Sequence, residues 1–315
     1  MTREEVEERL EEYAAYKAIK EAHEDVEENP PETDDDSLEK GVDNNSQNSD
    51  KEKEDETDEE ALTEVAPLDE EPQDETDHPP VPSLDNCDLS ELDLSDLNFL
   101  SISIQNANLT KAILNRANLS NSSLIKTNLK NANLNDSNLS EADLSDANLS
   151  HAILEDANLE GSTLNGANLS EAMLERANLR KCKLIESNLT NANLNEVTCG
   201  LADFSRSELT NVKAVGADFN RVKLSGANLN NADFTDARLS MAVFFESKFI
   251  GTNLNRAQIK GSKLVKANFT DATIKLLYLP NQNNQFTYTH FLSNDFYQLD
   301  LISSIENIVS SENQY

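Results

Sequence analysis

Tryptophan is absent from this chain of 315 residues, and glycine, cysteine and histidine are scarce. The eight glycines are dispersed, and none lies in the G-x-x-x-x-G-K motif that binds nucleotide phosphates. The four histidines are too far apart in sequence to predict a catalytic triad or a ligand cluster: His23, His78, His151 and His290. We therefore expect a protein that is not an enzyme and that holds no cofactor or metal.

The chain also lacks the features of a secreted or membrane protein. Three cysteines do not make a disulfide framework, and without a C-x-x-C or Cys/His spacing they are predicted to be small core residues: Cys87, Cys182 and Cys199. No apolar run approaches the roughly 20 residues that cross a bilayer. The N-terminus has no positive region followed by an apolar core, as a signal peptide would. We expect a soluble, cytoplasmic protein without membrane contact.

A five-residue repeat runs from Leu84 to Leu279. In all but two of 40 consecutive pentapeptides the central position, called i, is Leu, Ile or Phe. The run Ala107-Asn108-Leu109-Thr110-Lys111 shows the unit A-(N/D)-L-x-x, in which position i−2 is usually Ala, Ser or Thr. The apolar residues follow neither the period of 2 that is typical of a strand nor the period of 3.6 that is typical of a helix. A short fixed period of this length predicts a solenoid of stacked, similar steps.

This pattern resembles the pentapeptide-repeat family over residues of about 84–279. The resemblance implies an all-β solenoid, a right-handed quadrilateral β-helix with four pentapeptides in each coil. Side chains at i and i−2 would point inward, and those at i−1, i+1 and i+2 would point outward. About ten coils at the ~4.8 Å spacing of neighbouring strands would make a rod roughly 48 Å long.

The predicted core contains one large side chain on each side of each coil. One ladder of residues twenty apart consists of Leu109, Leu129, Leu149, Leu169 and Leu189, and phenylalanines fill the second half, among them Phe204, Phe219, Phe234 and Phe249. Burying each leucine should stabilise the rod by about 1.5 to 3 kcal/mol. The small central residues Cys199 and Ala214 predict a local irregularity or bend. Larger i−2 residues, such as Leu92 and Leu97, predict a looser first coil.

Position i−1 has a second rhythm, because Asn occupies every tenth residue from Asn98 to Asn188. Asn at these positions is predicted to support the turns. The alternate positions include Ile113, Ile153 and Met173, which we take as the candidate contact surface. Aligned carboxylates such as Asp136 and Asp156, or Glu155 and Glu175, would form an acid pair or a weak cation site, although a solvated face explains them better.

The charge is unevenly divided among four predicted segments. Residues 1–28 should form an acidic helix with a capping box at Thr2 and Glu5, and residues 29–83 a disordered acidic linker. Together they carry −25 of the net charge of −33, whereas the repeat region 84–279 and the C-terminal cap 280–315 carry −4 each. The helix is either exposed or docks a partner, and the linker either spaces the segments or attracts a basic partner.

The C-terminal cap is predicted to contain a helix that begins at Ser293 or Asn294 and ends near Val309. Its apolar stripe consists of Phe296, Leu299, Ile302, Ile305 and Val309. An open last coil exposes strand edges and core, so the helix should cover the end of its own rod or form a homodimer contact.

These features predict a non-enzymatic scaffold that presents the walls of a rigid β-helix to an unknown protein partner. No direct nucleic-acid binding is expected, because bases and acids are interleaved along the repeats. Seven bases nevertheless make the second half more basic than the first: Lys181, Lys183, Arg206, Arg221, Lys223, Lys263 and Lys266. The family resemblance also implies an alternative, a DNA-mimicking inhibitor or protector of a type II topoisomerase, similar to quinolone-resistance members. The near-balanced charge of the repeats weakens that alternative.

Overall fold

The computed structural model describes residues 1–28 and 82–273. Within these ranges the helix is α1, Arg3–Glu28. The chain divides into two compact units, one formed by Met1–Tyr16 with Pro82–Tyr315 and the other by Lys17–Val81. The predicted linker lies almost entirely outside the described residues, and the predicted C-terminal helix lies wholly outside them.

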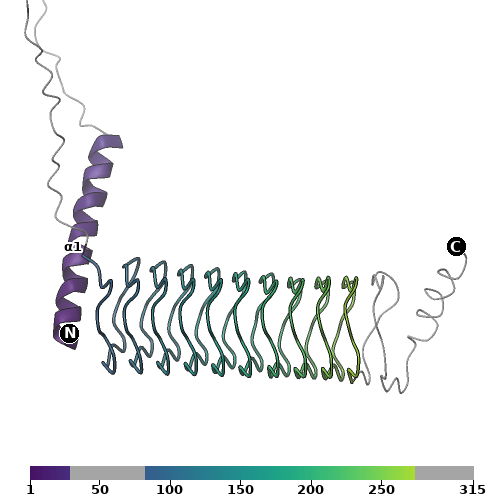
Figure 1. The fold of residues 1–315 in the computed structure, drawn as a ribbon. Helices are drawn as coiled ribbons and strands as arrows, with labels where there is room; N and C mark the ends of the chain where they lie inside the picture. The colour runs from purple at the N-terminus through teal and green to yellow at the C-terminus, as the bar shows by residue number, and fades with distance from the viewer. Residues whose placement is uncertain (29–81, 274–315) are drawn as a thin grey trace, which may run out of the picture. The chain divides into compact units, whose positions relative to one another are not determined.

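The repeat region forms coils of twenty residues. Every β-bridge in it is parallel and joins residues twenty positions apart, from Asp88 with Asn108 to Asn253 with Thr273. Each bridge is isolated, because only residue i−1 of a pentapeptide is paired and a turn follows it. Four pentapeptides therefore complete one coil, and Figure 1 shows the coils stacked from the first, in blue, to the last described one.

Backbone hydrogen bonds join each coil to the next in both directions. Leu109 N donates to Asn128 O at 2.7 Å, and Asn128 N donates back to Ala107 O at 2.9 Å. A third bond, from Ala112 N to Leu109 O at 3.0 Å, closes the turn between this pentapeptide and the next. The same three bonds recur along the rod, so the stack satisfies its own backbone without long strands.

Four walls enclose the core, and we number them by their inward central residues, counted in steps of twenty. Wall 1 runs from Leu84 to Leu264, wall 2 from Leu89 to Phe269, wall 3 from Leu94 to Leu254, and wall 4 from Phe99 to Ile259. On each wall, residue i−1 points outward at the middle, and residue i+2 lies at the corner.

Both inward positions are buried from the second coil onward, whereas the i−2 residues Cys87, Leu92 and Leu97 of the first coil are only partly buried. The wall 2 ladder is at most 1% exposed at each of its leucines: Leu109, Leu129, Leu149, Leu169 and Leu189. Four phenylalanines of the second half lie on four different walls and are equally buried: Phe204, Phe219, Phe234 and Phe249. Their rings contact one another inside the rod, with ring centroids 5.7 Å apart for Phe204 and Phe219 and 5.2 Å apart for Phe219 and Phe234.

The bend expected near Cys199 and Ala214 does not occur. Each small residue lies one coil before a phenylalanine on the same wall, Cys199 before Phe219 and Ala214 before Phe234. The backbone bonds continue there, from Cys199 N to Asp218 O at 2.9 Å and from Ala214 N to Asp233 O at 2.7 Å. The small side chains leave room for the rings of the next coil, so packing is balanced between coils.

Candidate functional site

The predicted contact residues Ile113, Ile153 and Met173 come together on wall 3. The bridges stack Ile113, Asn133, Ile153 and Met173 in consecutive coils, so their outward side chains form one row, which we call the wall 3 stripe. Ile113 is 38% and Met173 41% exposed, and Ile153 is half-buried. The other wall with an interrupted asparagine rhythm, wall 1, carries Ser, Asp and Thr at the corresponding positions of these coils. The two walls are therefore chemically different.

The asparagines at i−1 form side-chain ladders on walls 2 and 4. On wall 4, Asn118 Nδ2 donates to Asn98 Oδ1 at 2.9 Å, and Asn138 Nδ2 donates to Asn118 Oδ1 at 3.3 Å. Asn118 Oδ1 also accepts a hydrogen bond from the backbone N–H of Ser120 at 3.2 Å. The predicted support of the turn is thus present, and sequence analysis missed the amide ladder that accompanies it. These two walls are occupied by internal polar bonds.

The corners carry ion pairs between successive coils. Every i+2 residue of the described coils has φ between about +56° and +75°. Because residues twenty positions apart stack in consecutive coils, the outward side chains at one corner lie next to each other. Pairs of this kind join Asp96 to Arg116 at 2.7 Å and Asp156 to Arg176 at 2.8 Å. Hydrogen bonding to Arg176 lowers the pKa of the Asp156 carboxyl.

Arg176 binds one carboxylate of each aligned pair considered above, Asp156 and Glu175. Its guanidinium donates to Asp156 with Nε and Nη2, at 2.9 and 2.8 Å, and to Glu175 with Nη1 at 2.6 Å. Both carboxylates are therefore engaged in ion pairs with the same guanidinium. Across residues 1–28 and 82–273, no group of three or more His, Cys, Asp or Glu could hold a metal.

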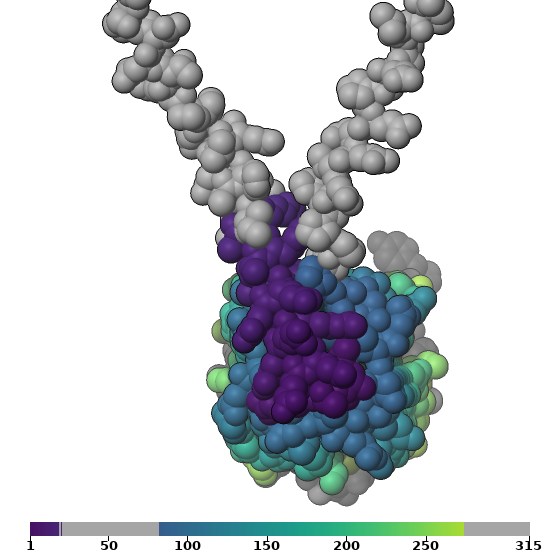
Figure 2. Space-filling model, turned by 90° about the vertical axis from the view of Figure 1, so that its left-hand side faces the viewer, coloured from purple at the N-terminus to yellow at the C-terminus, as the bar shows by residue number. Residues whose placement is uncertain are grey.

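The N-terminal half of α1 packs on the open face of the first coil. Figure 2 looks along the coils and shows these residues, in purple, over the blue first coil. Val6 is fully buried, and Leu10 and Tyr13 pack against the same cluster as Leu92 and Leu97 of that coil. The large i−2 side chains predicted to loosen the first coil instead provide a surface for the helix.

Three carbonyl groups at the edge of this coil accept hydrogen bonds from arginines of α1. Arg3 Nη1 donates to Asp93 O at 3.0 Å and its Nη2 to Ser95 O at 3.3 Å, while Arg9 Nη1 donates to Ser83 O at 3.0 Å. These arginines are the contact residues that the sequence did not identify.

The same three positions in the second coil accept backbone N–H groups of the first coil. Ser103 O accepts from Leu84 N at 2.8 Å, and Ile113 O accepts from Leu94 N at 2.7 Å. The guanidinium groups of α1 therefore take the place of a preceding coil and protect the strand edge. The sequence contained a signal for this cap, since Val6, Leu10 and Tyr13 share a helix face and the first coil has unusually large i−2 residues.

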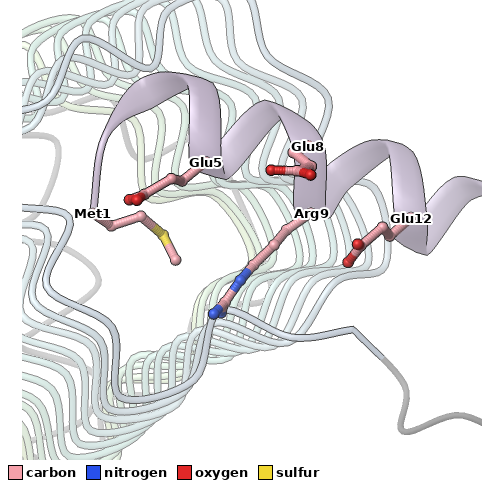
Figure 3. A pocket seen from close by; sticks show the side chains of 5 residues that line it. All are labelled: Met1, Glu5, Glu8, Arg9 and Glu12. Atoms are coloured by element: carbon pink, nitrogen blue, oxygen red, sulfur yellow. The ribbon is translucent and has the colours of Figure 1, made fainter.

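A hollow of about 480 Å³ lies beside this cap, lined by Met1, Glu5, Glu8, Arg9 and Glu12. Figure 3 shows Arg9 extending from the helix toward the ribbon of the first coil, away from the carboxylates of Glu5, Glu8 and Glu12. Glu5 is engaged in the predicted capping box, which is confirmed: its Oε2 accepts from Thr2 N at 2.7 Å, and Thr2 Oγ1 accepts from Glu5 N at 3.2 Å. With three carboxylates and a single apolar side chain, the hollow does not have the apolar lining typical of small-molecule sites.

The buried cysteines offer no reactive thiol. Burial raises the pKa of Cys182 to about 12 and raises that of Cys199 well above its usual value, so both remain protonated at neutral pH. Cys182 Sγ lies 2.8 Å from Leu159 O, as expected for a small core residue with a weak S–H donor. In the part of the chain that the structure describes, no helix is both long and apolar enough to span a bilayer.

Comparison with solved structures identifies the same architecture. HetL, a pentapeptide repeat protein involved in heterocyst differentiation regulation from the cyanobacterium Nostoc sp. strain PCC 7120, is 31% identical, with a TM-score of 0.51 over 64% of this chain and 88% of HetL. Rfr23 from the cyanobacterium Cyanothece 51142 is 33% identical over 34% of this chain and 83% of its own, with a TM-score of 0.22. QnrB1, a plasmid-mediated fluoroquinolone resistance protein, is 17% identical over 68% of this chain and 97% of its own, with a TM-score of 0.40.

No curated protein sequence matches the chain. The family model for pentapeptide repeats, in contrast, matches residues 102–141, 142–180, 174–211, 202–240 and 237–275. These segments cover more than half of the sequence and coincide with the coils. The chain therefore belongs to the pentapeptide repeat family and has its right-handed quadrilateral β-helix.

Proposed function

We propose that this protein is a non-enzymatic scaffold that binds a protein partner through the wall 3 stripe. The observation that carries the proposal is the alignment of Ile113, Ile153 and Met173 in one exposed row. The asparagine ladders bond walls 2 and 4 internally, whereas the stripe offers apolar side chains on a rigid surface. Exposed apolar groups gathered in this way are typical of interaction sites.

The similarity to HetL supports a role of this kind. That protein is described as involved in the regulation of heterocyst differentiation, which is a regulatory role. For the present chain we infer binding to a protein partner and no chemical reaction.

The charge pattern gives little support to the alternative, a DNA-mimicking inhibitor of a type II topoisomerase. Such a mimic needs a continuous negative surface, whereas one corner of this rod contains three acid–base pairs: Asp96 with Arg116, Asp156 with Arg176, and Asp236 with Arg256. The test is direct, because a mimic would inhibit or protect DNA gyrase in a supercoiling assay with and without a fluoroquinolone. A scaffold of the proposed kind leaves that reaction unchanged.

The scaffold proposal is tested by replacing apolar side chains of the wall 3 stripe with charged ones. The full-length variant Ile113→Glu/Met173→Glu should lose a partner that the wild-type chain recovers in a cross-linking pull-down from the source cell. Both side chains are outward, so the fold should remain, and circular dichroism and the unfolding midpoint verify this.

The matched control is Ser123→Glu/Thr163→Glu, which places the same charges on wall 1 in the same part of the rod. This variant should recover the partner as the wild type does. Equal recovery by the wall 3 variant and the control would show that the stripe is not the binding surface.

A further inference from the structure

The seven bases that are scattered through the second half of the repeat sequence stack on a single wall. Their positions recur every twenty residues, with Lys183, Lys223 and Lys263 at the middle of wall 1, Lys181 and Arg221 at one corner, and Arg206 and Lys266 at the other. We call this half of wall 1, residues 181–186 and every twentieth-residue equivalent through 261–266, the basic patch. In the preceding coils the same wall carries acids, including Glu141, Asp143 and Asp146. The net charge of the outward side chains on wall 1 therefore changes from negative to positive along the rod.

The acids within the basic patch neutralise only part of it. The patch contains three carboxylates, which pair as Glu186 with Arg206 at 2.7 Å, Asp203 with Lys223 at 3.3 Å, and Glu246 with Lys266 at 2.9 Å. Among the described residues, Lys183, Arg221 and Lys263 form no ion pair. An excess of exposed positive charge remains on this wall.

The basic patch also contains the two most exposed large apolar side chains of the described coils, Met241 and Leu201. Met241 is 57%, Leu201 49% and Phe245 40% exposed. Met241, Val243 and Phe245 are consecutive outward residues of one coil, so they cross the whole width of the wall. Lys266 Nζ lies 5.3 Å from the centroid of the Phe245 ring, which places a cation beside this apolar band.

An acidic segment with apolar side chains fits this surface better than a nucleic acid does. The apolar band interrupts the row of lysines, and three acids lie among the bases, whereas a nucleic-acid site has a continuous basic footprint. The binding segment should carry carboxylates to meet Lys183, Lys223 and Lys263, and apolar groups to cover Met241 and Phe245.

The chain itself contains such a segment after the last described coil. Residues 280–315 carry four acids and no base, and the stretch 293–309 has the apolar residues Phe296, Leu299, Ile302, Ile305 and Val309. Ser293 follows Thr273, in the last described coil, by twenty positions, and this length of chain reaches up to about 66 Å when extended. The predicted helix over these 17 residues would be about 25 Å long, enough for about five coils at ~4.8 Å each.

We propose that the basic patch on wall 1 is the docking site for residues 293–309 of the same chain. Charge complementarity, the apolar band and the short connection to the last coil together select this segment. The proposal concerns a different wall from the partner site, so each can fail without the other.

Carbodiimide coupling of the full-length monomer tests the contact, because it joins a lysine amine to a carboxylate that touches it. We expect linked peptides that pair Lys223 or Lys263 with Asp295, Asp300 or Glu306. The variant Val243→Asp/Phe245→Asp should lower their yield by about tenfold for each apolar side chain lost. The matched control Ile153→Asp/Met173→Asp, on wall 3, should leave the yield unchanged.

Amide hydrogen exchange provides a readout that does not depend on the reactive lysines. Lys223→Glu/Lys263→Glu should speed exchange over residues 293–309, and adding Asp295→Lys/Asp300→Lys to the same chain should restore protection. Exchange in the coils must stay at wild-type rates in both variants, which shows that the rod is intact.

Three results would overturn the proposal. Coupling of the patch lysines to acids of residues 29–81 would identify the linker as the occupant. Links found only between differently labelled chains would identify a second copy, and absence of any link or protection at residues 293–309 would leave the segment undocked.

Discussion

Each pentapeptide places a side chain at a corner in the left-handed region of φ, and this conformation decides which residues suit the corner. L-residues with a Cβ are disfavoured there, whereas Gly and Asn tolerate it. The chain follows this preference in part, with glycine at Gly161 (φ +75°) and asparagine at Asn131 (φ +57°). At Gly161 the carboxylate of Glu141, one coil earlier, occupies the space that a Cβ would need.

Leu201 is the corner residue at which this strain can be measured. It has φ +68° and is 49% exposed, so little packing offsets the unfavourable backbone. We expect Leu201→Asn to raise the free energy of unfolding by up to about 1 kcal/mol, and Leu201→Val to lower it, because β-branching worsens the clash. Urea unfolding of the three proteins gives the order, and a valine variant as stable as the asparagine variant would contradict the argument.

At the scale of elements, the N-terminal half of α1 and the first coil form one structure. The helix contributes Val6 to the core and arginine donors to a strand edge that otherwise has no preceding coil. The need for a cover follows from the stacked architecture, because the outermost coil exposes both its backbone edge and its interior.

Removing the cap should loosen the first coil before the rest. We expect Val6→Asp to accelerate amide exchange at Leu84 and Leu94, while Leu149 in the middle of the rod keeps its rate, since coils interact only with their neighbours. Hydrogen exchange read by mass spectrometry measures both regions. Glu11→Ala, on the exposed side of α1, serves as the control. Uniform acceleration along the rod would show instead that α1 stabilises the whole stack.

The sequence predicts most of the interior and only part of the surface, for a physical reason. An inward position such as Leu149 has one environment that tolerates only an apolar side chain, so the repeat reveals it directly. An apolar helix face such as that of Val6, Leu10 and Tyr13 could pack equally well on a partner, on a second copy or on the first coil of the same chain. Only the structure shows which of these surfaces it contacts. The asparagine ladder was missed because its bonds join residues twenty positions apart, while turn chemistry is local.

At the scale of the whole molecule, most of the negative charge lies outside the coils, and the corners of the rod are stabilised by paired charges. The pKa values of Asp96, Asp156 and Asp236 are lowered by hydrogen bonds from Arg116, Arg176 and Arg256 respectively. All three carboxyl groups are on the surface, so each pair contributes little alone.

These pairs predict how stability depends on pH. Because the folded-state pKa of Asp156 lies below the ordinary value of an aspartate, the unfolded chain takes up the proton first as pH falls. The stabilisation contributed by the Asp156–Arg176 pair is complete well above pH 4 and should be lost as pH drops through about 4 and below. Urea unfolding at pH 6 and pH 3 should show a smaller loss for Asp156→Asn than for the wild type. Parallel losses in the two proteins would contradict the assignment.

Because every described coil contains twenty residues, the sequence position of a residue determines the wall on which it lies. Deleting residues 129–148 would remove one complete coil. Every later side chain would stay on its wall, and the rod would be shorter by one coil. Deleting residues 129–133 would instead rotate everything downstream by a quarter turn. Ile113 would then lie on a different wall from Ile153 and Met173, although all three side chains would still be present and point outward. For such a chain, the length of an insertion or deletion modulo twenty affects recognition more than its composition does.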